Sequence, residues 1–453
     1  MLKKWLNKIL PSGRGGKRAE GKTVIPLERH NIRAEMLSFA AEKVICRLKE
    51  AGFQAYVVGG AVRDLLLGIE PKDFDVATDA TPEQVHKLFR RSRIIGRRFQ
   101  IVHVMNGAEV IEVTTFRGGA KVHQNARGRI MKDNTYGSIE EDAMRRDFTC
   151  NALYYDLEKE EILDFHNGMD DIAERRLVMI GNAAERYQED PVRILRAIRL
   201  SGKLGFELSQ ATARPIAESI GRLKHEPVAR LFDEIMKLLF SGRACECLKR
   251  LKEFDVPDDI HPLFNALNIS DGMDGKIIGL ALKNTDERLR ADKSVSVGFV
   301  LAALMWPELN RHWKVNLQQG LKPSHALSEA MNTLRDTVER GWGVPQRFSA
   351  TMREIWLFQP QFENRRGTRP HKLFAQARFR AAYDFLILRA AVGDADRTLV
   401  DWWTAFQTAS PEQRADMTKN QPSVRYGKNE GQAKKRRRRR RKPDQGSVGS
   451  NQQ

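Results

Sequence analysis

The segment from residue 54 to residue 68 constrains the fold of this chain more than any other. Residues 54–58 form an apolar run with β-branched and aromatic side chains, Gly59 and Gly60 follow, and residues 61–67 then have the character of a helix that Gly68 ends. Glycine lets the backbone approach a ligand closely, and the free N–H groups at the start of a helix attract anions. A strand, a turn and a helix in this order therefore suit a triphosphate, although the glycines alone also fit a tight turn without a ligand.

Asp73 and Asp75 follow this turn and are the most informative pair of side chains. On a strand, residues i and i+2 point to the same face, so two carboxylates at this spacing can converge on Mg²⁺. Such a site suits phosphoryl transfer. The same spacing recurs at Asp394 and Asp396, in a polar stretch whose composition predicts a solvated turn between helices. The first pair differs because the glycine turn precedes it, and we expect it to bind metal.

A third carboxylate is expected on the strand predicted over residues 109–117. If this strand lies beside the two aspartates, Glu112 completes a carboxylate cluster. The alternative is a polar residue on an edge strand. A separation of more than about 6 Å between Glu112 and both aspartates would remove it from any metal role.

Arg145, Arg146 and Asp147 stand at the end of a helix that Ser138 is predicted to open with a capping sequence. Two guanidinium groups beside a carboxylate can grip phosphate and ribose, because arginine donates charge-assisted hydrogen bonds and aspartate accepts one from a hydroxyl. Taken alone, the pattern is more often a surface ion pair.

Asp190 and Arg193 belong to a second conspicuous polar segment. Its local interpretation is structural: Asp190 caps a helix, Pro191 occupies the first helical position, and Glu189 lies one turn before Arg193. Arg193 and Arg196 are expected to face the same cleft. Capping alone would explain Asp190.

The chain of 453 residues carries a formal net charge of +19, and nine consecutive basic residues near its end account for almost half of it. They are Lys434, Lys435, Arg436, Arg437, Arg438, Arg439, Arg440, Arg441 and Lys442. The charge left without them, +10, makes the rest of the chain basic as well, so a polyanion is the natural partner. A nucleic acid fits better than a membrane surface because the chain also carries a predicted nucleotide site.

Four scattered cysteines, Cys46, Cys150, Cys245 and Cys247, favour neither a disulfide framework nor a structural zinc site and are typical of a reducing cytoplasm. No apolar run reaches the length of a membrane span. The first ten residues are basic, with apolar residues at helical spacing, and lack the cleavage site of a secretory signal. One hypothesis for this segment is weak peripheral contact with a membrane surface; the alternative is a frayed or docking helix.

The hydrophobic pattern predicts an α+β fold, with a mixed sheet in front and helices behind. Strand signals fade near residue 180, and amphipathic helical patterns then dominate to about residue 409. Residues 118–136 are polar and Gly-rich and are predicted to form a mobile loop beside the site. From about residue 418 the periodic apolar content is lost, which predicts a disordered basic tail.

Four motifs taken together resemble the bacterial nucleotidyltransferase family that contains CCA-adding enzymes and poly(A) polymerases. In the family's order, they are Gly59-Gly60-x-Val62-Arg63-Asp64, Asp73-x-Asp75, Arg145-Arg146-Asp147 and Glu189-Asp190-x-x-Arg193. No single motif is specific for this family, but the four motifs in this order are. Residues 94–104 resemble the stretch that distinguishes the poly(A) polymerase branch, and the basic C-terminus points the same way.

This resemblance implies a small mixed-sheet nucleotidyltransferase head followed by an all-helical neck, body and leg. The expected division is a basic N-terminal extension (1–30), the catalytic head (31–180), a neck that binds nucleotide and RNA (181–255), the body and leg (256–417), and the RNA-binding tail (418–453).

The resemblance also implies the roles of individual residues. Two Mg²⁺ ions are expected on Asp73 and Asp75, with Glu112 as the candidate third carboxylate. The triphosphate of the substrate ATP is expected to contact Gly59, Gly60 and Arg63. The remaining nucleotide-binding residues are Arg146 and Asp147 for the nucleotide and its sugar, and the base-reading pair Asp190 and Arg193.

The expected activity is template-independent transfer of AMP from ATP to RNA 3′ ends, with release of pyrophosphate, in the cytoplasm and in support of RNA decay. The basic residues Lys434–Lys442 would hold the RNA, and RNA-decay nucleases or helicases are candidate partners. Two alternatives remain at this stage: a CCA-adding tRNA nucleotidyltransferase, and an RNA-binding protein with an inactive head. The oligomeric state is open.

Overall fold

A computed structural model describes residues 21–96, 100–118, 135–269, 271–419 and 421, together with the backbone of two short strands between residues 118 and 135. The basic run Lys434–Lys442 and the N-terminal segment 1–20 lie outside the described residues, as do residues 97–99 of the segment expected to distinguish the poly(A) branch.

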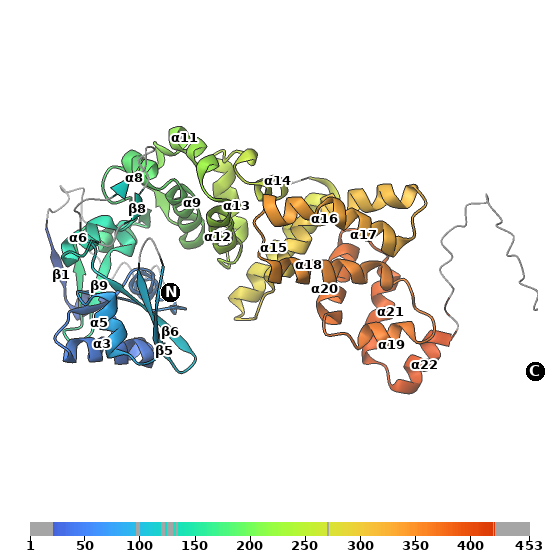
Figure 1. Ribbon diagram of the computed structural model, residues 1–453, viewed down its shortest axis with the longest axis horizontal. Coiled ribbons are helices and arrows are strands. Elements are labelled where there is room, and N and C mark those ends of the chain that lie inside the picture. Colours follow the sequence, from blue (N-terminus) through green and yellow to red (C-terminus); the bar gives the residue numbers. More distant parts are fainter. Residues whose placement is uncertain are drawn as a thin grey trace, which may run out of the picture.

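Eight strands of the head form one mixed sheet, in the order β1-β10-β9-β2-β3-β6-β5-β4 (Figure 1). Their bounds are β1 Thr23–Ile25, β2 Ala55–Val58, β3 Asp75–Thr78, β4 Ser92–Ile95, β5 Ile101–Asn106, β6 Glu109–Thr115, β9 Leu153–Asp156 and β10 Glu161–Asp164. The central strand β3 pairs antiparallel with β2 and parallel with β6. The predicted mixed sheet is confirmed.

Helices cover both faces of this sheet. On one face, α3 (Phe39–Glu50) contacts the central strands β2, β3 and β6, and α5 (Pro82–Leu88) contacts β4, β5 and β6 toward the edge. On the other, α6 (Ile139–Arg145) places Ala143 in a small apolar cluster with Val58, Ala77 and Tyr154. Because Asp75 and Ala77 stand two residues apart on β3, Asp75 lies on the face that α6 covers.

Local signals predict three helix starts correctly. Thr81 and Gln84 form a reciprocal capping box at the start of α5, and Ser138 and Glu141 form another at the start of α6. The helix after the glycine turn is α4 (Gly60–Leu66), and Gly59 is its N-cap residue.

Two parts of the head differ from the prediction. β1 pairs antiparallel with β10, with Val24 opposite Leu163, so the sheet takes in residues that the expected division places in the N-terminal extension. Within the segment predicted as a loop, β7 (His123–Gln124) and β8 (Ile130–Lys132) pair antiparallel, and the Gly118 N–H donates to the Thr135 carbonyl. Such short strands have too few residues for a detectable alternation.

The described chain beyond the head is almost entirely helical and extends away from the sheet (Figure 1). The region expected to form the neck, residues 181–255, contains α8 Ala183–Glu189, α9 Val192–Leu204, α10 Gln210–Ala213, α11 Ile216–Ser219, α12 Val228–Leu239 and α13 Ala244–Glu253. The strands β11 (Arg176–Leu177) and β12 (Glu207–Leu208) pair beside them. The region expected to form the body and leg, residues 256–417, contains two successive groups of helices. The first group, named the body below, is α14 Pro262–Asn268, α15 Gly272–Arg290, α16 Val297–Gln318, α17 Pro323–Thr333, the π-helix η5 Thr337–Gly341 and α18 Gln346–Phe358. The second group, named the leg below, is α19 Arg369–Phe374, α20 Phe379–Ala391, α21 Arg397–Thr408 and α22 Pro411–Lys419. Among the described helices, none has the length and apolar character needed to cross a membrane.

The second aspartate pair is not the solvated turn that its composition predicts. The carboxylate of Asp394 is enclosed and accepts hydrogen bonds of 2.8 Å from both Arg389 and Trp306. Asp396 is exposed and caps α21 by accepting from the Thr398 N–H. The prediction is wrong for Asp394 because Trp306 and Asn310 of α16, 88 and 84 residues away in the sequence, donate to its carboxylate together with Arg389 of the preceding helix α20.

Candidate active site

Asp73 lies in the loop before β3, and Asp75 is the first residue of that strand. Phe74 between them is buried, whereas Asp73 is exposed and Asp75 is half-buried. Only Asp75 belongs to the strand, so strand geometry does not by itself orient the Asp73 side chain. The Asp73 carboxylate contributes to the electrostatics of Asp75, and the convergence of the pair on a metal stays a prediction.

Strand β6 brings Glu112 to Asp75. The two residues stand opposite each other in the parallel pairing of β3 with β6, and neighbouring strands lie about 4.8 Å apart. Glu112 also forms an ion pair of 3.3 Å with His103 of β5. Within the part of the chain that the structure describes, no group of three or more His, Cys, Asp or Glu side chains is arranged to hold a metal, so the role of Glu112 stays a prediction.

The local electrostatics favour a cation at Asp75. Burial raises the pKa of Asp75 to about 6, the carboxylates of Glu112 and Asp73 act in the same direction, and Arg146 opposes them. Carboxylates that disfavour one another's ionisation are stabilised when a positive charge lies between them. Their oxygens are also the ligand type that Mg²⁺ prefers.

The glycine turn lies directly against this pair. Gly59 has φ = 79° and ψ = −130°, a conformation that residues with a Cβ rarely adopt. A Cβ built there would lie 4.0 Å from Asp75 Oδ2 and 3.7 Å from Arg146 Nη1. The turn, one aspartate and one predicted nucleotide-binding arginine therefore meet at a single point.

Arg63 supports the turn from within the head. It is buried, its Nε and Nη2 atoms donate to Asp64 at 2.8 and 2.6 Å, and its Nη1 donates to Asn151 Oδ1 at 2.5 Å. A Cβ at Gly60 would lie 3.4 Å from Arg63 Nη2. The guanidinium group thus lies beside the start of α4, and its three hydrogen bonds to Asp64 and Asn151 hold it there.

Arg146 is held by two partners on the site face of the sheet. Its Nη2 pairs with Asp142 Oδ2 at 2.9 Å, one helical turn earlier, and its Nε donates to the Tyr154 hydroxyl at 2.9 Å. The Tyr154 hydroxyl in turn donates to Asp142 Oδ2 at 2.7 Å. These contacts leave Nη1 directed toward Gly59.

Asp147 joins the head to the neck. Its Oδ1 accepts from the Phe148 N–H and from Asn151, and its Oδ2 lies 2.6 Å from Arg196 of α9. Burial opposes ionisation of Asp147, but the Arg196 charge, these hydrogen bonds and the more distant Arg193 lower its pKa to about 2. Asp147 is therefore an ionised acceptor at neutral pH.

Asp190 and Arg193 lie close to this junction, but Asp190 does not cap α9. Pro191 is the N-cap residue, and the Asp190 carboxylate instead accepts from Arg230 of α12 at 3.0 and 3.1 Å. The predicted pairing of Glu189 with Arg193 is confirmed at 3.0 Å. The capping prediction is wrong because Arg230, 40 residues away in the sequence, donates hydrogen bonds to the Asp190 carboxylate.

Several residues of this site carry no signal in the sequence. Asn151, Tyr154 and Arg230 reach the predicted residues only through tertiary contacts. Asp142 is different, because its position four residues before Arg146 on a predicted helix is a recognisable ion-pair spacing.

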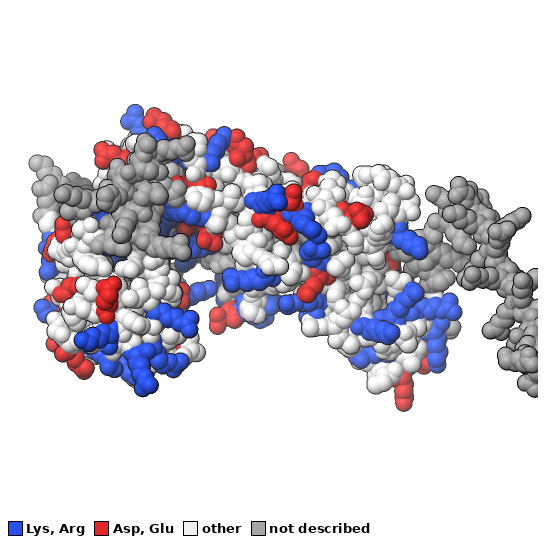
Figure 2. Space-filling model, viewed as in Figure 1, with Lys and Arg blue, Asp and Glu red and all other residues white. Residues whose placement is uncertain are grey.

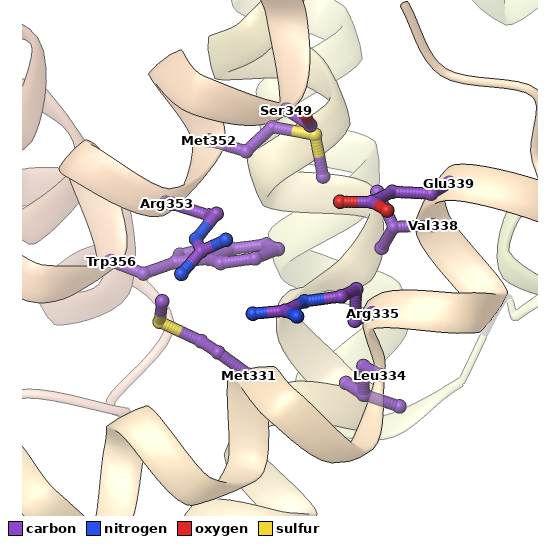
Figure 3. A pocket seen from close by; sticks show the side chains of 9 residues that line it. All are labelled: Met331, Leu334, Arg335, Val338, Glu339, Ser349, Met352, Arg353 and Trp356. Carbon is purple, nitrogen blue, oxygen red and sulfur yellow. The ribbon is translucent and has the colours of Figure 1, made fainter. Parts of the chain in front are cut away.

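A separate pocket lies in the body between α17, η5 and α18 (Figure 3). Buried Met331, Met352 and Trp356 line it beside exposed Arg335 and Arg353. Its volume of about 20 Å³ is enough for ordered water, whereas ligand sites typically measure roughly 300–1,000 Å³. This pocket does not have the size of a nucleotide site.

Comparison with known proteins agrees with the geometry of the head. Family models match at residues 55–178 (poly A polymerase head domain), 205–267 (probable RNA and SrmB-binding site of polymerase A) and 319–443 (polymerase A arginine-rich C-terminus). A crystal structure of the Bacillus stearothermophilus CCA-adding enzyme in complex with CTP is similar over 82% of both chains, with a TM-score of 0.54 and 27% identity. The fold and the site define a nucleotidyltransferase.

The relatives distinguish between branches of this class. Poly(A) polymerase I of Salmonella typhi is 43% identical over 87% of this chain and 88% of its own, and that of Escherichia coli O157:H7 is 44% identical over the same shares. The CCA-adding enzyme of Bacillus pumilus is 42% identical over only 45% of this chain and 50% of its own. The chain belongs to the bacterial poly(A) polymerase I family. The expected enzyme class, fold and template-independent polyadenylation of RNA are thereby confirmed.

Proposed function

We propose that AMP transfer from ATP to RNA 3′ ends takes place where the Gly59 turn, Asp75 and Arg146 meet. The position of Gly59 carries this proposal: a Cβ built there would lie 4.0 Å from Asp75 Oδ2 and 3.7 Å from Arg146 Nη1, so a helix start that suits phosphate lies beside a carboxylate and a guanidinium group. Nucleotidyl transfer needs this combination, since catalysis consists of positioning the reactants and neutralising charge.

Two Mg²⁺ ions would be held by Asp73 and Asp75, with Glu112 as a further candidate ligand. The donor set fits, because these are carboxylate oxygens, and burial together with repulsion from Glu112 and Asp73 raises the pKa of Asp75, so that a nearby cation would stabilise its ionised form. When bound, such ions make the RNA 3′-hydroxyl a better nucleophile and offset the charge of the leaving pyrophosphate.

The remaining residues would bind and orient the nucleotide. The N–H groups at Gly59 and Gly60 would receive the triphosphate, while Arg63 holds the turn and adds positive charge beneath it. Arg146 would present Nη1 to the phosphates, and ionised Asp147 would accept from a ribose hydroxyl.

Asp190 and Arg193 would read the adenine base. In the described structure Arg230 and Glu189 hold their side chains, so base recognition would use their remaining donor and acceptor atoms. These partners restrict the side chains to one arrangement, which suits selection of a single nucleotide.

RNA would extend from the head over the helical part. Lys and Arg side chains gather over the leg around α19 and α21, where Arg366, Arg369, Lys372 and Arg397 are exposed (Figure 2). The basic run Lys434–Lys442 would add nine positive charges and hold the RNA between additions. The match at residues 205–267 supports an RNA contact of the neck.

Further proposals concern the setting of the enzyme. We propose that it acts in the cytoplasm, that RNA-decay nucleases or helicases are its protein partners, and that the basic N-terminal segment makes weak peripheral contact with membrane surfaces. The division into head, neck, body, leg and tail is proposed to separate catalysis from RNA retention.

A nucleotide competition assay on a generic RNA primer tests the proposed reaction. With ATP alone, the products should lengthen continuously, and CTP should be a poor substrate. Addition that stops after a short defined sequence with CTP and ATP would identify a CCA-adding enzyme instead. Absence of any Mg²⁺-dependent incorporation would indicate an RNA-binding protein with an inactive head.

A further inference from the structure

Arg186 of α8 is bonded to both halves of the proposed nucleotide site. Its Nη2 donates to the main-chain carbonyls of Arg145 and Arg146, at 2.7 and 2.6 Å. Its Nη1 donates to Glu189 Oε2 at 2.9 Å, and its own carbonyl accepts from Arg193 Nη1 at 2.9 Å. One residue therefore contacts the chain that carries Arg146 and the side chain of the proposed base-reading arginine.

The contacts on the head side fix the end of α6. The last carbonyl groups of a helix have no partner within the helix, and here a single guanidinium group satisfies two consecutive carbonyls. Asp147 follows immediately, with its carboxylate on Arg196. The position of the Arg146–Asp147 peptide thus depends on where α8 holds the Arg186 side chain.

The contacts on the neck side fix Arg193. Glu189 Oε2 accepts from both Arg186 and Arg193, at 2.9 and 3.0 Å, so the carboxylate bridges two guanidinium groups. The side chains of Arg186 and Arg193 are each only 13% exposed, which restricts their movement. Removal of Arg186 would leave Glu189 and Arg193 paired with each other and would remove the two hydrogen bonds that Arg186 donates to the end of α6.

We infer that Arg186 is a positioning residue for nucleotide selection, which keeps the sugar-binding Arg146–Asp147 segment in register with the base-reading Asp190 and Arg193. The inference rests on the proposed function, because it assigns those four residues to the nucleotide. Arginine suits this task better than lysine, since its planar group donates in fixed directions to two carbonyls and a carboxylate at once. A misplacement of about 1 Å between binding groups can lower the rate by about 100-fold.

A purely structural role for Arg186 makes a different prediction. It would lower the melting temperature of any variant and leave the kinetic constants of the folded enzyme unchanged. The positioning role predicts a change in ATP kinetics and in the preference for ATP over CTP, with the KM for RNA unaffected.

The test compares the full-length variants Arg186→Met and Arg186→Lys with Arg176→Met. Arg176 of β11 is a matched control, because it also contacts two acidic residues, Asp171 and Glu174, and lies outside the residues proposed to bind nucleotide or RNA. The kcat/KM for ATP, its ratio to that for CTP and the KM for an RNA primer are measured for each, together with the rise in melting temperature produced by ATP.

We expect Arg186→Met to lose about 10- to 100-fold in kcat/KM for ATP, with a smaller ATP/CTP ratio and a smaller ATP-induced thermal shift, and Arg186→Lys to be intermediate. Arg176→Met should match the wild type. Kinetic constants of Arg186→Met equal to those of Arg176→Met would overturn the inference. If Arg186→Met does not fold, wild-type ATP kinetics in Arg186→Lys would overturn it. A wild-type enzyme that does not incorporate ATP would instead refute the proposed function.

Discussion

Substitution of Gly59 by alanine separates the strain of the turn from its role in catalysis. At φ = 79° and ψ = −130° the alanine backbone is strained, at a cost of about 1–3 kcal/mol in the free energy of unfolding of the head. The new Cβ would make only ordinary contacts, at 3.7 Å from Arg146 Nη1 and 4.0 Å from Asp75 Oδ2. The protein should therefore fold, with the extra methyl group inside the proposed phosphate site.

The effect on activity should exceed the effect on stability. A hydrogen bond to a charged group contributes about 1.5–3 kcal/mol, and the methyl group would weaken at least one such bond between the turn and the triphosphate. At 1.4 kcal/mol per factor of ten, kcat/KM for ATP should fall by roughly 10- to 100-fold. Primer-extension kinetics and denaturant unfolding measure the two quantities separately.

Gly52 offers the matched control. It has a similar φ of 85°, lies in the same head, and a Cβ there would meet no atom within 4 Å. Gly52→Ala should be destabilised to a comparable degree and keep its activity. If Gly59→Ala retained as much kcat/KM for ATP as Gly52→Ala, the turn would have no special role in binding the triphosphate.

Three further predictions concern the tail, a buried histidine and a buried ion pair. Deletion from Lys434 onward should shorten the products while leaving single additions unchanged. The slope of log affinity for RNA against log salt concentration should decrease by up to about 0.7 for each lost phosphate contact. Unchanged product length would contradict a role of the tail in RNA retention. Burial lowers the pKa of His261 to about 4. Between pH 6.5 and 4 the folded state therefore binds fewer protons than the unfolded state, and the free energy of unfolding decreases as the pH is lowered. His261→Asn, which keeps a capping side chain for α14, should flatten this slope by up to about 3 kcal/mol in urea unfolding, and an unchanged slope would refute the assignment. Asp394→Ala should cost about 3–5 kcal/mol of unfolding free energy because it leaves the Arg389 charge buried alone, with no loss of kcat per folded molecule; a stability loss no larger than that of Asp396→Ala would contradict this.

Local features of this chain are predictable because their causes lie within a few residues. The capping boxes that begin with Thr81 and Ser138 each involve side chains three residues apart, and both helices start where expected. The strand, glycine turn and helix around Gly59 also occur in the predicted order, as β2 and α4. Each of these features depends on residues that are close in the sequence.

Features that depend on distant partners are not predictable in this way. Asp190 has the local features of a helix cap, yet Arg230 of α12 holds its carboxylate. Asp394 has the composition of a solvated turn, yet Trp306 and Asn310 of α16 donate hydrogen bonds to its carboxylate. In both cases a residue distant in the sequence determines the surroundings of the carboxylate, and the neighbouring residues give no sign of it.

Neutralisation of a single carboxylate tests the account most directly. Asp75→Asn keeps the shape of the side chain and removes its charge, and Asp396→Asn makes the same change in the other Asp-x-Asp motif, where asparagine can still cap α21. With labelled ATP, an RNA primer and Mg²⁺, Asp75→Asn should lose more than about 100-fold of its incorporation rate, while Asp396→Asn should retain the wild-type rate. Equal incorporation by the two folded variants would contradict the central claim that the acidic pair beside the glycine turn is the catalytic centre.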